Sequence, residues 1–425
     1  MNHTLITSKG MKVTFIPLNK FKTVQISLKM IAPFKAETIN KRSLLPGVLL
    51  AGSKDYPNKK RLSVALEELY GMEINGSTRR IGSQSIISFD MSICADEYIP
   101  EETSLFDEGI KLLSSVLLHP LTRNNKFLKS IVEEEKRLIV DDLIAIYHDK
   151  QEYSFELFKN QMFPEELYRF NPKGDLSTLD SVTSVQLSEY YHQVLNEDHI
   201  ELYIIGQIDP ASVMVTLEKY LPLSSHQVSG SFVDDELVEP QNKYVVEKGD
   251  ITQTKLSIGF RTTVHSKHPL HYAMSLFNII FGESDQSILF QTIREKHHLS
   301  YYVSSMYVSS KSVLFVFAGI KQHEESEVVE LVKTALEDVK QGNILEEQLD
   351  LAKKIYLSRM KKSLDSESQL IARHFVSYQL FGVSDRNDEI KNQIENMKLE
   401  DIIMAAKTVT LDTIHIYEGG DVLDE

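Results

Sequence analysis

The spacing of apolar and polar residues predicts both strands and helices along the chain. In the stretch 86–94 (IISFDMSIC) apolar and polar positions alternate, which is typical of a β-strand. Elsewhere apolar residues recur at helical spacing, which predicts helices at 105–118, 127–147, 271–281, 324–339 and 346–364. Because runs of strands are interspersed with paired helices, the pattern predicts an α+β fold rather than a doubly wound sheet.

An internal repeat divides the chain into two halves. Residues 66–93 align without a gap with residues 293–320, at an offset of 293 − 66 = 227. Both stretches read as the end of a helix, a strand, a polar hairpin connection and a second strand. A helix followed by a strand also occurs twice, at 179–206 and at 394–420. Two such pairs in the same order indicate a duplication.

The repeat predicts the domain organisation. The stretch 224–235 (SSHQVSGSFVDD) is polar and contains a glycine, which is the composition of a surface linker. We therefore expect a first half at 1–223, a linker at 224–245 and a second half at 246–425.

Composition excludes several classes of protein. The 425 residues include 46 Lys and Arg against 61 Asp and Glu, a net charge of -15, which argues against a nucleic-acid binder. No run of about 18 apolar residues is free of charge, so the sequence predicts no membrane span. Cys94 is the single cysteine and cannot form an internal disulfide. A lone thiol fits a reducing compartment, and no secretion signal is visible, so we expect a cytoplasmic protein.

Three passages resemble the insulinase-like (M16) zinc peptidases. They are 281–304 (FGESDQSILFQTIREKHHLSYYVS), 199–209 (HIELYIIGQID) and 56–78 (YPNKKRLSVALEELYGMEINGST). The resemblance runs along nearly the whole chain, in the order and with the duplication of the family. It implies two homologous halves, each of antiparallel sheets packed with helices, that form a clamshell around a peptide-binding chamber.

The zinc motif of the family is missing. Active members carry His-x-x-Glu-His on a helix, where two histidines bind zinc and the glutamate acts as general base. Counted back from the Tyr56-Pro57 turn, the motif falls on residues 43–47, with Ser43 and Gly47 at the histidine positions and Pro46 at the glutamate position. Ser43 is expected to be an N-cap with Pro46 in the first helical turn, so a helix presenting residues 43 and 47 on one face is not expected.

The acidic residues of the family motif are retained in part. Glu135 keeps one carboxylate, and Asp142 stands at the later ligand position with a shorter side chain. Without histidines, both are expected to be ordinary polar residues of an amphipathic helix. None of the 14 histidines forms a zinc-peptidase motif, and the group 265–271 (HSKHPLH) favours a solvated loop. We therefore expect neither a metal nor a cofactor in this chain.

The second-half passage keeps two residues that in active members bind the substrate and stabilise the tetrahedral intermediate. Carried over by the motif they are Arg294 and Tyr301, with Tyr302 as the neighbouring alternative. Some bacterial members work as two unlike subunits, one with the zinc motif and one supplying Arg and Tyr. This chain resembles the second type, specifically the zinc-less member of paired proteins in Gram-positive bacteria, some of them associated with modification of elongation factor P.

The resemblance therefore predicts a noncatalytic subunit with a zinc-bearing M16 homologue as partner and a peptide or small protein as substrate. A binding or scaffold protein without any proteolytic role is the alternative. An autonomous peptidase is disfavoured, because the sequence contains no recognisable set of residues that would activate water or a nucleophile.

Overall fold

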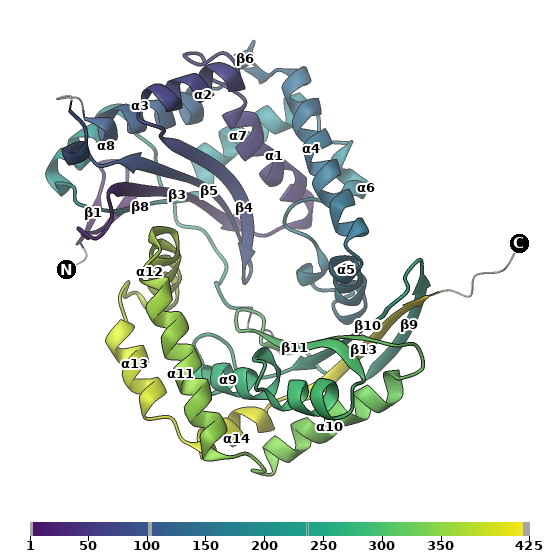
Figure 1. Ribbon diagram of the computed structural model, residues 1–425. Coiled ribbons are helices and arrows are strands. Elements are labelled where there is room, and N and C mark those ends of the chain that lie inside the picture. The colour runs from purple at the N-terminus through teal and green to yellow at the C-terminus, as the bar shows by residue number, and fades with distance from the viewer. Residues whose placement is uncertain (1–2, 101–103, 235, 237, 420–425) are drawn as a thin grey trace, which may run out of the picture. The chain divides into compact units, whose positions relative to one another are not determined.

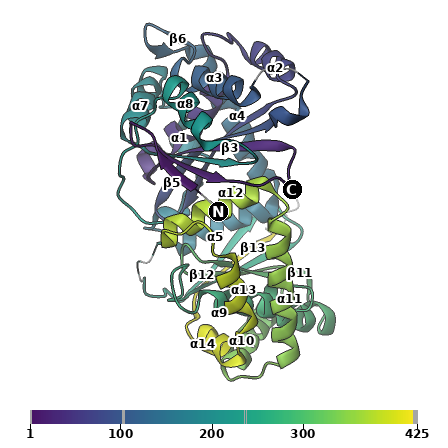
Figure 2. The same ribbon diagram turned by 90° about the vertical axis from the view of Figure 1, so that its left-hand side faces the viewer.

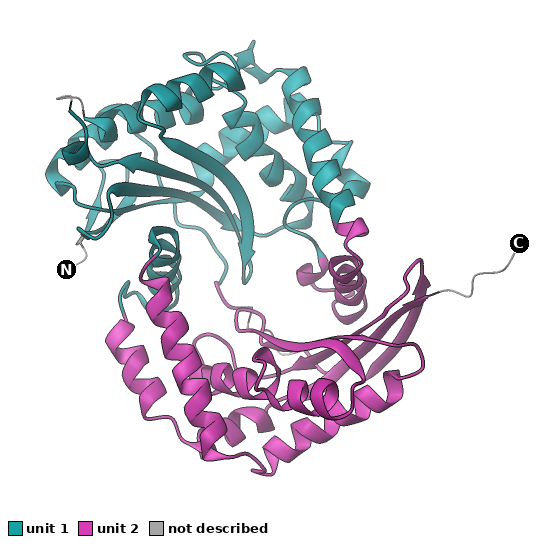
Figure 3. Ribbon diagram, viewed as in Figure 1, with its two compact units in different colours: residues 1–145, 170–231, 366–385 teal, residues 146–169, 232–365, 386–425 magenta. Residues whose placement is uncertain are grey.

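The computed structural model describes residues 3–100, 104–234, 236 and 238–419. Figure 1 shows the elements along the chain. The described chain forms two compact units, and both are discontinuous in sequence. Unit 1 comprises residues 1–145, 170–231 and 366–385, and unit 2 comprises residues 146–169, 232–365 and 386–425 (Figure 3).

Unit 1 is built on a six-stranded sheet with strand order β1-β2-β8-β3-β5-β4. The strands are β1 (His3–Ile6), β2 (Lys12–Ile16), β3 (Thr23–Pro33), β4 (Glu73–Ile81), β5 (Gln84–Cys94) and β8 (His199–Ile205). All neighbours are antiparallel except β2 and β8, which run parallel. The sheet is therefore mixed rather than wholly antiparallel.

Helices cover one face of this sheet and bury its apolar side chains. They include α1 (Ile39–Leu50), α3 (Leu105–Leu118), α7 (Ser184–Glu197) and α8 (Pro210–Tyr220). Alternation along β3 decides which residues face them: Val24, Ile26, Leu28 and Met30 belong to the core. The intervening positions face the other side of the sheet, where α12 (Glu367–Phe381) lies against β3 and β8 (Figure 2).

Unit 2 repeats this topology with five strands in the order β11-β12-β10-β13-β9. These are β9 (Lys243–Gly249), β10 (Thr254–Arg261), β11 (Ser300–Val308), β12 (Val313–Ile320) and β13 (Thr410–Gly419). Again one neighbouring pair, β9 and β13, is parallel. The helices on the core face are α9 (His271–Asn278), α10 (Glu325–Lys340), α11 (Glu346–Ser363) and α14 (Leu399–Lys407).

The structure confirms the hairpins that the repeat predicts. Residues 73–81 form β4, and the same positions shifted by 227 form β11 at 300–308. Each pairs antiparallel with the next strand of its unit.

The remaining elements are α2 (Lys59–Glu68), α4 (Lys129–His148), α5 (Lys150–Met162), α6 (Leu176–Leu179), α13 (Asn387–Glu395), β6 (Thr122–Arg123), β7 (Lys126–Phe127) and the short helices η1 (Ala36–Thr38), η2 (Asp96–Tyr98), η3 (Leu167–Arg169), η4 (Ile279–Glu283) and η5 (Phe290–Lys296).

Each compact unit contains a helix from the opposite half of the sequence. Helix α5, from the first half, packs on the unit 2 sheet, where Phe158 and Met162 bury against Val313 and Phe315. Helix α12, from the second half, belongs to unit 1. The residues that make up each compact unit therefore differ from the continuous segments 1–223 and 246–425.

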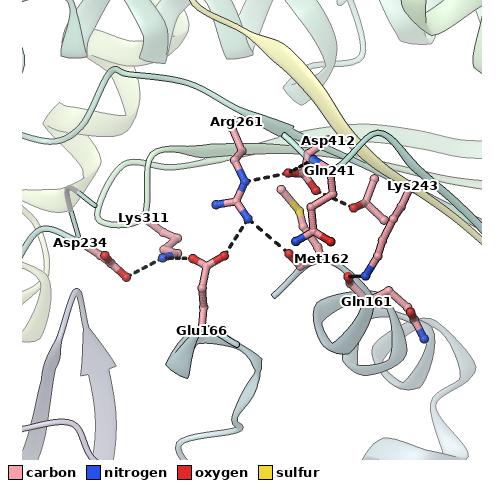
Figure 4. A network of polar contacts seen from close by, with 10 residues as sticks. Gln161, Met162, Glu166, Asp234, Gln241, Lys243, Arg261, Lys311 and Asp412 are labelled. Carbon is pink, nitrogen blue, oxygen red and sulfur yellow. Dashed lines mark hydrogen bonds and ion pairs between the residues drawn. The ribbon is translucent and has the colours of Figure 1, made fainter. Parts of the chain in front are cut away.

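A network of charges fixes the end of the α5 segment to the unit 2 sheet (Figure 4). Arg261 on β10 donates to Asp412 on β13 at 2.7 Å and to Glu166 at 2.7 Å. Glu166 also pairs with Lys311, whose ammonium group lies 2.6 Å from Asp234. Asp234 lies in the region before β9. The network therefore links this region and the α5 segment to the sheet.

None of the described helices is long and apolar enough to cross a membrane.

Candidate functional site

The positions of the family's zinc motif lie on an uninterrupted helix. Helix α1 begins after Thr38 and runs through Pro46 to Leu50. The expectation that Ser43 is an N-cap is therefore wrong: it lies inside the helix, where its hydroxyl donates to the carbonyl of Asn40 at 3.1 Å. Residues 43 and 47 are four apart on this helix and share one face.

Proline inside the helix is tolerated because a distant side chain replaces the missing donor. Pro46 has no N–H to donate to the carbonyl of Arg42, four residues earlier. The hydroxyl of Thr78, on β4, donates to that carbonyl at 3.1 Å. Arg42 is buried, so a carbonyl without a partner there would be costly. Thr78 thus allows the helix to continue where the sequence predicts its start.

Gly47 makes room for the carboxylate of Glu135. A Cβ built on Gly47 would lie 2.1 Å from Oε2 of Glu135, so any larger residue would require that carboxylate to move. Glu135, on α4, is 7% exposed. The ammonium group of Lys59, at the start of α2, donates to its Oε1 at 2.7 Å. This hydrogen bond is the main reason why the pKa of Lys59 is raised.

The residues at these positions do not fit a zinc ion. Ser43 and Gly47 offer no imidazole, Pro46 offers no carboxylate, and Asp142 is exposed on α4. The one retained carboxylate, Glu135, already has an ammonium group as its cation. Across the described residues no group of three or more His, Cys, Asp and Glu side chains could hold a metal. The zinc chemistry of active M16 peptidases therefore has no set of ligands at this position.

Arg294 lies on a helical segment of unusual geometry in unit 2. It belongs to η5, a π-helical segment, and a second π-helical segment, η4, precedes it. Such segments occur frequently at functional sites. The side chain of Arg294 is 45% exposed, and its guanidinium lies 4.8 Å from the centre of the Phe290 ring. One face of the guanidinium is thus supported by an aromatic ring while the group stays in contact with solvent.

Tyr301 occupies a bulge at the edge of the unit 2 sheet. Ser300 pairs with Ile320 and Tyr302 with Gly319, so Tyr301 is the extra residue on β11. It is 61% exposed. Tyr302 instead packs over Gly319, where a Cβ would lie 2.4 Å from its ring, and burial raises its pKa to about 12. The bulge therefore presents Tyr301 to solvent and places Tyr302 against the sheet.

The roles of Lys59 and Thr78 could not be predicted from the sequence. Neither belongs to a spacing pattern that marks a site, and each acts on a residue far away in the chain. A lysine at the start of a helix and a threonine in a strand have no local signature of these roles. Their importance follows from the fold alone.

The duplicated fold and the altered motif together define a relative of zinc peptidases that lacks the zinc ligands. Residues 181–356 match the model of the family described as "Peptidase M16 inactive domain". The chain is 30% identical over 414 residues to "Probable inactive metalloprotease YmfF" of Bacillus subtilis, covering 96% of both proteins. The chain belongs to the M16 peptidase family and is an inactive-type homologue within it.

Two further comparisons also extend along most or all of the chain. "Uncharacterized zinc protease YmxG" of Bacillus subtilis is 24% identical over 375 residues, which is 84% of this chain and 88% of that protein. The crystal structure of a conserved protein from Enterococcus faecalis has a TM-score of 0.94 at 24% identity and covers 100% of both chains. The fold is thus shared along the full length of the chain.

Proposed function

We propose that this protein is the noncatalytic subunit of a two-subunit zinc peptidase, in which a zinc-bearing M16 homologue cleaves the peptide. The proposal is supported by a contrast between two sets of family residues: the residues of the zinc motif and the substrate-binding Arg and Tyr. At the zinc positions the ligands are replaced, and Lys59 now pairs with Glu135. In the other set, both Arg294 and Tyr301 are present and exposed.

The chemistry of these two side chains suits the proposed role. Arg294 carries a permanent charge and several N–H donors, which can bind the carbonyl groups of a peptide backbone. The hydroxyl of Tyr301 can donate a hydrogen bond to the negative oxygen that develops when the peptide bond is attacked. Neither role requires a metal in this chain. The substrate would be a peptide or a small protein.

The relatives support the existence of a partner. Bacillus subtilis has both a relative named as probably inactive and a relative named as a zinc protease. One cell can therefore contain both kinds of subunit that the proposal needs. A cytoplasmic location and an association with modification of elongation factor P stay predictions.

Substitution in a reconstituted pair tests the proposal. A zinc-bearing M16 homologue from the same cell is purified with this chain, and cleavage of a peptide library is measured. Arg294→Ala, which loses backbone binding, and Tyr301→Phe, which loses a transition-state donor, should each lower kcat/KM by about 10²-fold. Size-exclusion chromatography should show that both variants still assemble with the partner.

Matched controls distinguish the loss of Arg294 or Tyr301 from the general effect of changing an exposed side chain. Lys296→Ala removes a neighbouring exposed charge from η5, and Tyr244→Phe removes a hydroxyl from a 57% exposed tyrosine on β9. Both should leave kcat/KM unchanged. An assembled pair whose activity survives Arg294→Ala and Tyr301→Phe would contradict the proposal and favour a binding or scaffold role.

A further inference from the structure

The backbone that carries Arg294 and Tyr301 is fixed within unit 2. Arg294 lies on η5 and Tyr301 on β11, and these two elements pack against each other. Where they meet, the backbone N–H of Leu299 donates to the carbonyl of Ile293 at 3.0 Å. The side chain of Ile293 is 0% exposed, so this junction is anchored in the close-packed core. The fold therefore sets the relative positions of Arg294 and Tyr301 in the backbone.

The side chain of Arg294, in contrast, has few contacts in the described part of the chain. Oε1 of Glu295 lies 4.0 Å from its Nε, and the two side chains are 45% and 53% exposed. A pair of exposed charges at this distance contributes little. An arginine side chain has several rotatable bonds, and fixing them carries an entropic cost. Arg294 therefore needs another contact if its guanidinium is to keep one orientation.

The ring of Phe290 supplies that contact. Phe290 and Arg294 are four residues apart on η5, so their side chains are neighbours on the helical surface. The guanidinium carbon lies over the ring, 4.8 Å from its centre. A cation is attracted to this position because the face of an aromatic ring is negatively polarised. At an exposed site such a contact favours the stacked conformation by about two- to fivefold.

Phe290 is itself held in place by its surroundings. Its ring is half-buried and packs against the core of unit 2. The preceding residue, Leu289, is 0% exposed and lies against η4, where a Cβ on Gly282 would be 3.0 Å from its Cδ1. The N–H of Phe290 donates to the hydroxyl oxygen of Ser287, a buried residue, at 3.4 Å. The ring is thus a fixed platform for the partly exposed arginine.

We propose that Phe290 is a positioning residue for Arg294: it orders the guanidinium before a peptide binds and keeps it directed at the peptide backbone. This role rests on the proposed function, because a peptide is the ligand that Arg294 holds there. Ordering the guanidinium in advance removes part of the entropic cost that binding otherwise carries. The role of Phe290 is indirect, since it acts on the substrate through Arg294.

Kinetics of the reconstituted pair test this role. Phe290→Leu keeps an apolar side chain but removes the ring, so kcat/KM should fall by about two- to fivefold, the preference that the ring provides. Phe290→Tyr keeps the ring and should retain the wild-type kcat/KM. Phe290→Met also lacks a ring and takes the place of Phe290→Leu if that variant does not fold. The matched control is Phe21→Leu, which removes a ring that lies 5.8 Å from Nζ of Lys20 and should leave kcat/KM unchanged.

A double-mutant cycle separates positioning from a general structural effect. Because Phe290 acts through Arg294, Phe290→Leu should cause no further loss in a chain that already carries Arg294→Ala. Equal losses in both backgrounds would indicate a structural role and overturn the proposal. An unchanged kcat/KM in Phe290→Leu, with Arg294→Ala strongly impaired, would overturn the positioning role and leave the proposed function intact. If Arg294→Ala itself has no effect on the assembled pair, both are overturned.

NMR tests the contact in the isolated chain, without a partner or a substrate. The Nε–H resonance of Arg294 is identified by its absence from the spectrum of Arg294→Ala. A nearby aromatic ring shifts this resonance, so it should move in Phe290→Leu and stay close to its wild-type position in Phe290→Tyr. A resonance at the same position in the wild type and in Phe290→Leu would overturn the stacked arrangement and the positioning role with it.

Discussion

Replacement of Lys29 by methionine should make the protein more stable. Lys29 is 3% exposed, and its ammonium group donates a hydrogen bond to Ser27 at 2.9 Å. Burial lowers its pKa from 10.5 to about 8, and attraction to Asp90 offsets this only in part. Methionine keeps a similar length and fills the same buried space without a charge.

The pKa gives the size of the effect. At pH 7 the lysine is charged in both the folded and the unfolded chain, and a pKa of about 8 against 10.5 corresponds to a cost of about 3 kcal/mol. Some of this gain is lost with the hydrogen bond to Ser27, so we expect Lys29→Met to raise the free energy of unfolding by about 1–3 kcal/mol.

Urea denaturation followed by circular dichroism measures this change. The dependence on pH provides a second check. Between pH 8 and 10.5 Lys29 binds more protons in the unfolded chain than in the folded protein, so the free energy of unfolding of the wild type increases as the pH rises through that range. The advantage of Lys29→Met should therefore shrink towards pH 10.5. The exposed control Lys173→Met should change stability by less than about 0.5 kcal/mol. A Lys29→Met protein less stable than wild type at pH 7 would refute the reasoning.

Three further predictions each concern a single side chain. Thr78→Val removes the hydroxyl that donates to the Arg42 carbonyl, so urea denaturation should show a loss of about 1–3 kcal/mol; an unchanged midpoint would contradict the role of Thr78. Phe158→Ala should cost about 3–5 kcal/mol and speed proteolytic cleavage within 146–169, and equal cleavage rates would speak against α5 as an apolar anchor. Burial lowers the pKa of His271 from 6.5 to about 4, so stability should fall by up to about 3 kcal/mol as the pH drops through that range; His271→Phe should lack this dependence, and coincident pH profiles would disprove it.

Much of the fold could be predicted because the repeat and the periodicity are local signals. The offset of 227 residues places β11 at the position predicted from β4, and the expected helix at 105–118 is α3. The sequence could not show that α5 and α12 each join the compact unit of the other half. Their periodicity marks a buried face but does not say which sheet covers it.

The replaced zinc site shows a different limit of sequence reasoning. The missing ligands could be read directly at residues 43–47. The continuation of α1 through Pro46 could not, because it depends on Thr78, which is 36 residues from the carbonyl that it satisfies. Likewise the sequence shows Gly47 only as the residue at the second histidine position, whereas in the structure it leaves space for Glu135. In both cases the decisive contact joins separate parts of the chain.

The most direct test of the central claim is a native pull-down of this protein from its source cell, analysed by mass spectrometry and assayed for cleavage of a peptide library. We predict that an M16 homologue carrying His-x-x-Glu-His co-purifies and that the complex cleaves peptides in a manner abolished by a chelator. Recovery of this chain without such a homologue and without peptide cleavage would contradict its role as a noncatalytic peptidase subunit.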